Sequence, residues 1–179
     1  MSAEYDLDRA IRKVADFPKP GILFYDITTL ISHAEAFGEV LTILENRYKD
    51  RGIDSVVAVE ARGFIFGGAL ADRLGVGFIP VRKPGKLPYK TRSVQYELEY
   101  GTDELHMNED AVEGLKKVLL LDDLLATGGT ALATARLIEQ GGAKVEECAF
   151  VIDLTFLPGR KRLEEAGYPV FNIVEFDHE

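Results

Sequence analysis

The stretch that decides the fold is Val118-Leu119-Leu120-Leu121-Asp122-Asp123-Leu124-Leu125-Ala126-Thr127-Gly128-Gly129-Thr130. Its first four residues are apolar and predict a buried parallel strand that ends at the acidic pair. The two glycines predict a tight turn, and residues 131–140 have the spacing of a helix. Ligands of open α/β sheets bind at the carboxyl ends of the strands, so this stretch marks a candidate binding site.

The turn has the composition of a phosphate-binding loop. Gly128 and Gly129 allow the backbone to direct its N–H groups inward, and the flanking threonines add hydroxyl donors. The start of the following helix adds a positive dipole end, so we expect a cup for a phosphate monoester. Carboxylates repel phosphate, and the natural partners of Asp122 and Asp123 are sugar hydroxyls or a divalent cation.

Two simpler interpretations compete with the phosphate cup. A buried strand, a solvated acidic turn and a capped helix would produce the same pattern without a ligand. The acidic strand of a P-loop ATPase also ends in carboxylates, but the sequence contains no G-x-x-x-x-G-K-[ST] loop. It also contains no G-x-G-x-x-G dinucleotide motif.

Composition and charge restrict the class of protein. The chain has 179 residues, enough for one domain with a substantial core, and its net charge is −9. This charge argues against nucleic-acid binding. The segment from Arg82 to Arg92 contains five basic residues and no acidic one, which indicates either a small polyanionic ligand or a merely solvated loop; its cations are Arg82, Lys83, Lys86, Lys90 and Arg92.

The remaining segments predict an α/β fold with a doubly wound, mainly parallel central sheet flanked by helices. The expected strands are 55–59, 77–81, 118–121, 144–152 and 170–176, and the expected helices are 5–14, 34–48, a helix ending at 74, 131–140 and 160–166. Residues 93–98 and 104–107 predict a projecting hairpin. Cys148 lies in an apolar run and is expected to be a core thiol. No secretory signal or membrane span is expected, which favours the cytoplasm.

Residues 122–130, Asp-Asp-Leu-Leu-Ala-Thr-Gly-Gly-Thr, resemble the phosphoribosyl-pyrophosphate (PRPP) motif of the type I phosphoribosyltransferases. The N-terminal Phe-Pro-Lys-Pro-Gly and the later Arg-Gly-Phe-Ile-Phe-Gly narrow the resemblance to the branch that acts on adenine. The resemblance implies conversion of adenine and PRPP to AMP and diphosphate, with Mg²⁺ held mainly by PRPP and no metal site built by the protein alone. It also implies a homodimer. The alternatives are a PRPP-binding regulatory module and a phosphoribosyltransferase for a 6-oxopurine.

The same resemblance assigns roles to individual residues and segments. It implies catalytic roles for Glu99, Asp122 and Asp123, PRPP binding by Arg62, Arg82, Lys83, Lys86, Ala126, Thr127, Gly128, Gly129 and Thr130, and adenine binding by Leu23, Phe24 and Leu124. It further implies one domain over residues 1–179, with a base-covering hood at about 17–30, a mobile loop at about 86–107 and a cis peptide between Glu60 and Ala61. Many relatives have arginine where this chain has Tyr25.

Overall fold

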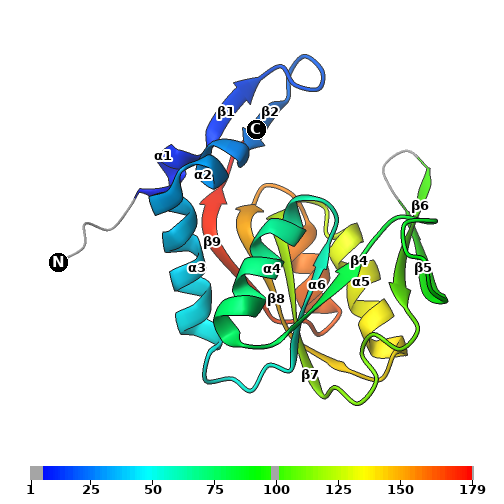
Figure 1. Cartoon of the computed structure of the whole chain (residues 1–179). Helices are drawn as coiled ribbons and strands as arrows, with labels where there is room; N and C mark the ends of the chain where they lie inside the picture. The colour runs from blue at the N-terminus through cyan, green and yellow to red at the C-terminus, as the bar shows by residue number, and fades with distance from the viewer. Residues whose placement is uncertain (1–5, 98–100, 179) are drawn as a thin grey trace.

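The structure is a computed structural model that describes residues 6–97 and 101–178. Its centre is a sheet of five parallel strands in the order β4-β3-β7-β8-β9 (Figure 1). These strands are β3 Ser55–Val59, β4 Gly77–Val81, β7 Lys117–Leu125, β8 Lys144–Leu154 and β9 Val170–Phe176. The predicted α/β fold with a parallel, doubly wound sheet is therefore confirmed.

Helices cover both faces of this sheet. The helices are α1 Leu7–Ala10, α2 Thr28–Ser32, α3 Ala34–Tyr48, α4 Arg62–Leu74, α5 Gly129–Gln140 and α6 Gly159–Glu165. Neighbouring residues of β3 point to opposite faces, so Val56 packs in the core formed with α3 and α4, and Val57 in the core formed with α5 and α6. Cys148 is fully buried in the second core, and burial raises the pKa of its thiol to about 12. Its interpretation as a core thiol is confirmed.

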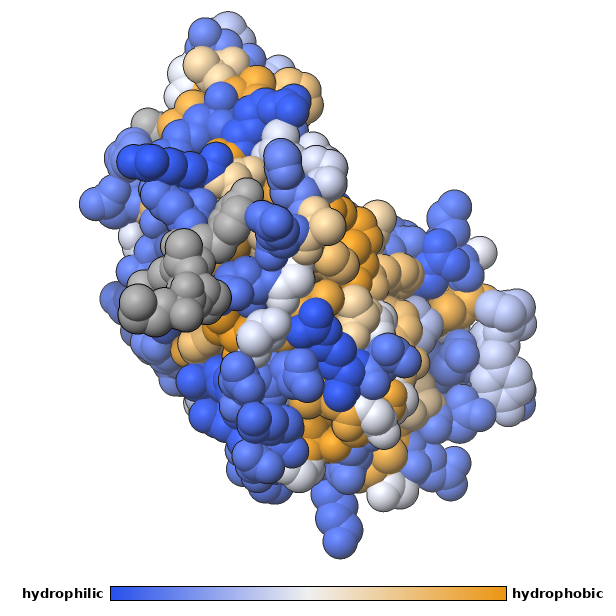
Figure 2. Space-filling model, turned by 60° about the vertical axis from the view of Figure 1, so that its left-hand side comes forward, coloured by the Kyte–Doolittle hydropathy of each residue, from blue (hydrophilic) through white to orange (hydrophobic). Residues whose placement is uncertain are grey.

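The N-terminal region forms a small antiparallel hairpin that projects from the sheet (Figure 1). Its strands are β1 Arg12–Ala15 and β2 Leu23–Asp26. The prediction of a helix through residue 14 was wrong, because α1 ends at Ala10 and the next residues pair with β2. Figure 2 shows apolar surface on this projection. Phe17, between the two strands, is 51% exposed.

Tyr25 anchors this hairpin to the C-terminal strand. Its ring is buried and stacks on Phe176 with the ring centroids 4.0 Å apart. Its hydroxyl donates a hydrogen bond to the carbonyl of His178 at 2.8 Å. The role of Tyr25 is therefore to pack the hairpin against the C-terminal strand.

Two corrections concern the segments around the site. Strand β7 was expected to end before Asp122, but it continues to Leu125 because β8 runs beside it and the pairing continues from Asp122 opposite Phe150 to Leu125 opposite Asp153. The segment 86–107 is rich in charged and turn-forming residues, a composition that predicts few anchors to a core, and it contains nearly all of the hairpin of β5 Thr91–Glu97 and β6 Thr102–Asn108. Its second strand buries Leu105 and Met107 completely in the core beside α5.

Among the residues that the structure describes, no helix has both the length and the apolar composition needed to cross a membrane.

Candidate active site

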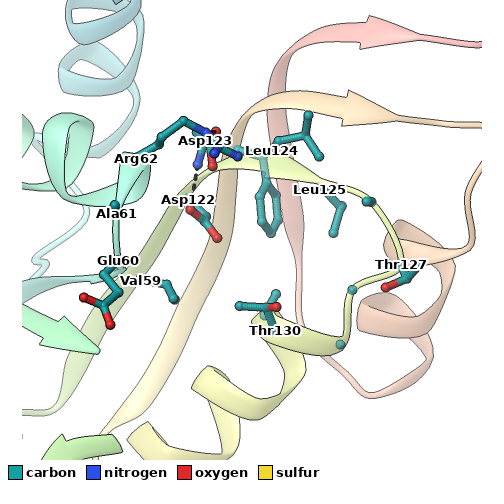
Figure 3. Close-up of a pocket in the computed structure, with 15 residues that line it drawn as sticks. Val59, Glu60, Ala61, Arg62, Asp122, Asp123, Leu124, Leu125, Thr127 and Thr130 are labelled. Atoms are coloured by element: carbon teal, nitrogen blue, oxygen red, sulfur yellow. Dashed lines mark hydrogen bonds and ion pairs between the residues drawn. The ribbon is translucent and has the colours of Figure 1, made fainter. Parts of the chain in front are cut away.

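A pocket of about 250 Å³ opens where β3 and β7 reach their carboxyl ends (Figure 3). Two loops face each other across it, one after β3 and one after β7. The lining residues are Val59, Glu60, Ala61, Arg62, Asp122, Asp123, Leu124, Leu125, Ala126, Thr127, Gly128, Gly129, Thr130, Ala131 and Phe150. The pocket thus brings together the acidic pair, Arg62 and the whole predicted phosphate loop. The peptide bond between Glu60 and Ala61 is cis.

The loop after β7 turns directly into α5. Gly128 is the N-cap residue and has a φ of 80°, a left-handed conformation that favours glycine. An added Cβ at Gly128 would also lie 3.0 Å from the backbone of Gly159. The first amides of α5 and its positive dipole end therefore face the pocket, an arrangement suited to an anion.

The acidic pair is held by Arg62 and by its own backbone. Asp123 is buried and its carboxylate accepts a hydrogen bond from Nε of Arg62. Oδ1 of Asp122 accepts a hydrogen bond from the amide of Asp123 at 2.9 Å. Loss of water around the carboxyl group raises the pKa of Asp122, and the nearby charge of Asp123 raises it further. The pocket therefore offers carboxylate oxygens beside an arginine, groups that can accept hydrogen bonds from hydroxyls and stabilise positive charge.

The other predicted basic residues, Arg82, Lys83 and Lys86, lie outside the pocket lining, and the side chains of Arg82 and Lys83 are paired with carboxylates. Glu60 accepts hydrogen bonds from Nε of Arg82 at 2.9 Å and from the amide of Lys83 at 2.8 Å. The hydrogen bond from the Lys83 amide is the main cause that lowers the pKa of Glu60, and Arg82 lowers this pKa further. Lys83 also forms an ion pair with Asp103 of β6, and the Lys86 carbonyl accepts a hydrogen bond from Arg82 at 3.0 Å.

The predicted base-binding residues lie in two places. Leu124 lines the pocket. Leu23 and Phe24 are partly buried in the N-terminal hairpin, where Phe24 packs edge-on against Phe17 with the ring centroids 5.1 Å apart. Glu99 lies outside the residues that the structure describes.

Sequence reasoning missed several residues around the site. Glu60 follows a buried strand directly, so the strand-end argument applied to Asp122 would also have selected it. No local pattern indicated Phe150, which is brought to the pocket by β8, or Asp103, which reaches Lys83 from the hairpin. Within residues 6–97 and 101–178, no three His, Cys, Asp or Glu side chains form a metal-binding group.

The family model for the phosphoribosyl transferase domain matches residues 27–177. Because this match covers most of the chain, and the pocket contains the acidic pair and loop of that domain, the protein belongs to the phosphoribosyltransferase family.

The similar proteins described next are adenine phosphoribosyltransferases. The enzyme of Chloroflexus aurantiacus is 55% identical over 171 residues, which are 96% of this chain and 98% of the relative. The crystal structure of the Thermoanaerobacter pseudethanolicus enzyme has a TM-score of 0.90 at 50% identity and covers 95% of this chain and 98% of its own. The Saccharomyces cerevisiae enzyme, solved with adenine and an imino-altritol bisphosphate, has a TM-score of 0.86 at 40% identity, with 93% and 96% covered. The resemblance to the adenine branch is therefore confirmed.

Proposed function

We propose that the protein transfers the phosphoribosyl group of PRPP to adenine, which yields AMP and diphosphate. The observation that carries this proposal is that Asp122, Asp123 and the loop 126–130 at the start of α5 line the same pocket. In the reaction, the bond between C1′ of the ribose and the diphosphate oxygen breaks. A bond between C1′ and a ring nitrogen of adenine forms, and that nitrogen loses its proton.

The loop 126–130 holds the 5′-phosphate through backbone amides and the hydroxyls of Thr127 and Thr130. This part of PRPP does not react, so its binding energy serves to orient C1′ toward the base. The carboxylates of Asp122 and Asp123 accept hydrogen bonds from the ribose hydroxyls. Their negative charge stabilises the positive charge that develops on the sugar as diphosphate leaves.

The diphosphate lies toward Arg62, Arg82, Lys83 and Lys86, whose positive charge balances that of the leaving group. The residues present fit Mg²⁺ brought in by the substrate, since the pocket contributes carboxylate oxygens, the ligands that this ion prefers, but too few for a complete site. When bound, Mg²⁺ supplies further charge neutralisation for the diphosphate.

The N-terminal hairpin acts as the hood over adenine, with the backbone of Leu23 and the ring of Phe24 as contacts. Leu124 contacts the base from the pocket, and Glu99 balances the proton on the imidazole side of the base. We assign the hood to about residues 17–30 of a single domain that spans 1–179. The reaction takes place in the cytoplasm.

The test of this proposal is product identification. Incubation with PRPP, Mg²⁺ and each purine base in turn should give AMP from adenine, and little nucleotide from the other bases. A site whose polar groups match one base edge discriminates strongly against another. Faster turnover of hypoxanthine, guanine or xanthine would favour a 6-oxopurine enzyme, and PRPP binding without any nucleotide would favour a regulatory module.

Two further properties belong to this proposal. The segment 86–107 stays anchored in the core at Leu105 and Met107, and the part before these residues closes over bound PRPP and excludes water from the cation-like sugar. PRPP with Mg²⁺ should therefore slow trypsin cleavage after Lys86, Lys90 and Arg92, and equal rates with and without PRPP would contradict a lid.

The active form is a homodimer, and a fully active 19.8 kDa monomer in light scattering would contradict it.

A further inference from the structure

In the phosphate loop, three consecutive backbone carbonyls accept hydrogen bonds from groups outside the pocket lining. The Ala126 carbonyl accepts a hydrogen bond from the amide of Gly159 at 3.0 Å. The Thr127 carbonyl accepts one from Nη1 of Arg162 at 2.8 Å. The Gly128 carbonyl accepts one from the amide of the fourth residue of α5 at 2.9 Å. Each of these three consecutive carbonyls therefore has a donor.

The amides of the same loop, unlike its carbonyls, lack hydrogen-bond partners among the described residues. In the described part of the chain, the N–H groups of residues 127–131 donate no backbone hydrogen bond. Thr127 is exposed, but the other four residues are buried or half-buried. Amides in such positions need an acceptor, and a phosphate group supplies several. A carbonyl that rotated into the pocket would repel that phosphate, so the carbonyl partners influence the quality of the cup.

Two of the three donors come from α6, which is distant in sequence from the loop. Figure 3 shows the turn that carries Thr127 lying against this helix. The approach is close, because a Cβ added to Gly159 would lie 2.3 Å from the Ala126 oxygen and 2.8 Å from a methyl group of Leu125. Arg162 is exposed and is absent from the pocket lining, so its contact is with the outer side of the loop.

We propose that Gly159 and Arg162 are positioning residues for PRPP: they hold the carbonyls of Ala126 and Thr127 outward so that the loop amides meet the 5′-phosphate. This inference rests on the proposed function, in which that loop binds the 5′-phosphate. Arg162 acts through the Thr127 carbonyl, and therefore affects the binding of phosphorylated ligands while leaving the base site unchanged.

The experiment compares Arg162→Ala with Lys161→Ala. Lys161 is an adjacent exposed cation of α6 that forms a 3.8 Å ion pair with Glu165. Loss of a hydrogen bond from a charged donor predicts a KM for PRPP raised about 5- to 20-fold in Arg162→Ala. Its kcat, its KM for adenine and its melting temperature should stay close to those of the wild type. Arg162→Lys, which keeps a donor, should recover most of the loss, and Lys161→Ala should match the wild type.

A second readout separates this inference from the proposed function. Ribose 5-phosphate should raise the melting temperature of the wild type and of Lys161→Ala more than that of Arg162→Ala. This pattern would support the inference even if the wild type formed no AMP, a result that would refute the transferase proposal alone. The positioning role of Gly159 and Arg162 would be overturned if ribose 5-phosphate raised the melting temperature equally in all variants and their KM values for PRPP were equal. Gly159→Ala should raise the KM for PRPP more than Arg162→Ala, and a smaller increase in a folded Gly159→Ala protein would also overturn it.

Discussion

The two regions proposed to hold the two ends of PRPP are built in opposite ways. The loop 126–130 presents backbone amides at a helix N-terminus, and its carbonyls already have donors. The region proposed for diphosphate uses side-chain cations instead, and Arg62, Arg82 and Lys83 are each paired with a carboxylate. One end is ready for an anion, whereas the other must exchange internal partners for the ligand. We therefore expect the 5′-phosphate of PRPP to meet a preformed loop, and the diphosphate to require side chains that change partners.

The largest effect is expected where the two regions meet, at the acidic pair. Asp123→Asn removes the charge that holds Arg62 and keeps the shape of the side chain. We expect kcat to fall on the order of 10- to 1,000-fold for Asp122→Asn or Asp123→Asn, because the lost charge acts on the transition state. Steady-state kinetics with PRPP and adenine measures it, and unchanged kcat and KM in both variants would contradict a catalytic role.

A change in the preformed loop should mainly affect binding. Gly128→Ala introduces a side chain at a left-handed position and against Gly159, so the loop must shift. We expect the KM for PRPP to rise about 10- to 100-fold, with a smaller change in kcat. Gly142→Ala is the matched control, since Gly142 also has a positive φ, of 97°, but a Cβ added there would have no neighbour within 4 Å. Equal kinetics in both variants would show that the loop adapts readily.

For the region proposed to bind diphosphate, we expect a substitution that lowers a KM instead of raising it. Asp103→Asn weakens the ion pair that holds Lys83, so the lysine becomes available to diphosphate. We expect the KM for diphosphate in the reverse reaction to fall about two- to fivefold, a change typical of a partly exposed ion pair. Asp110→Asn removes the same charge from an exposed turn and serves as the control. An increased KM in Asp103→Asn alone would mean that the pair organises this region for binding.

The smallest expected effect is on stability and follows from the raised pKa of Asp122. A carboxyl group with a higher pKa in the folded state binds its proton more tightly there. Its stabilising contribution is present below the ordinary pKa of about 3.9 and is lost as the pH rises through the folded-state pKa. We therefore expect Asp122→Asn to melt about 2–4 °C above the wild type at pH 8, with a smaller difference at pH 4. A constant difference across this range, measured by thermal scans, would contradict it.

The sequence alone determined the architecture and the location of the site. Periodicity predicted α3 at residues 34–48 and β9 at 170–176 with the bounds that the structure has. The strand that ends in Asp122 and Asp123, followed by the glycine turn, predicted which sheet edge carries the pocket. These features are local in the chain, because strand burial, glycine turns and helix starts depend on residues within a few positions of one another.

Tertiary structure alone decided which groups meet. Strand β7 extends past the acidic pair because β8 pairs with it, and Tyr25 is a packing residue because the C-terminal strand passes beside it. The partners of Arg62, Lys83 and the Thr127 carbonyl lie 61, 20 and 35 residues away in the chain. A carboxylate, a cation or a carbonyl can bond to any of many complementary groups, and only the packing of the sheet, the hairpin and α6 selects the one that it contacts.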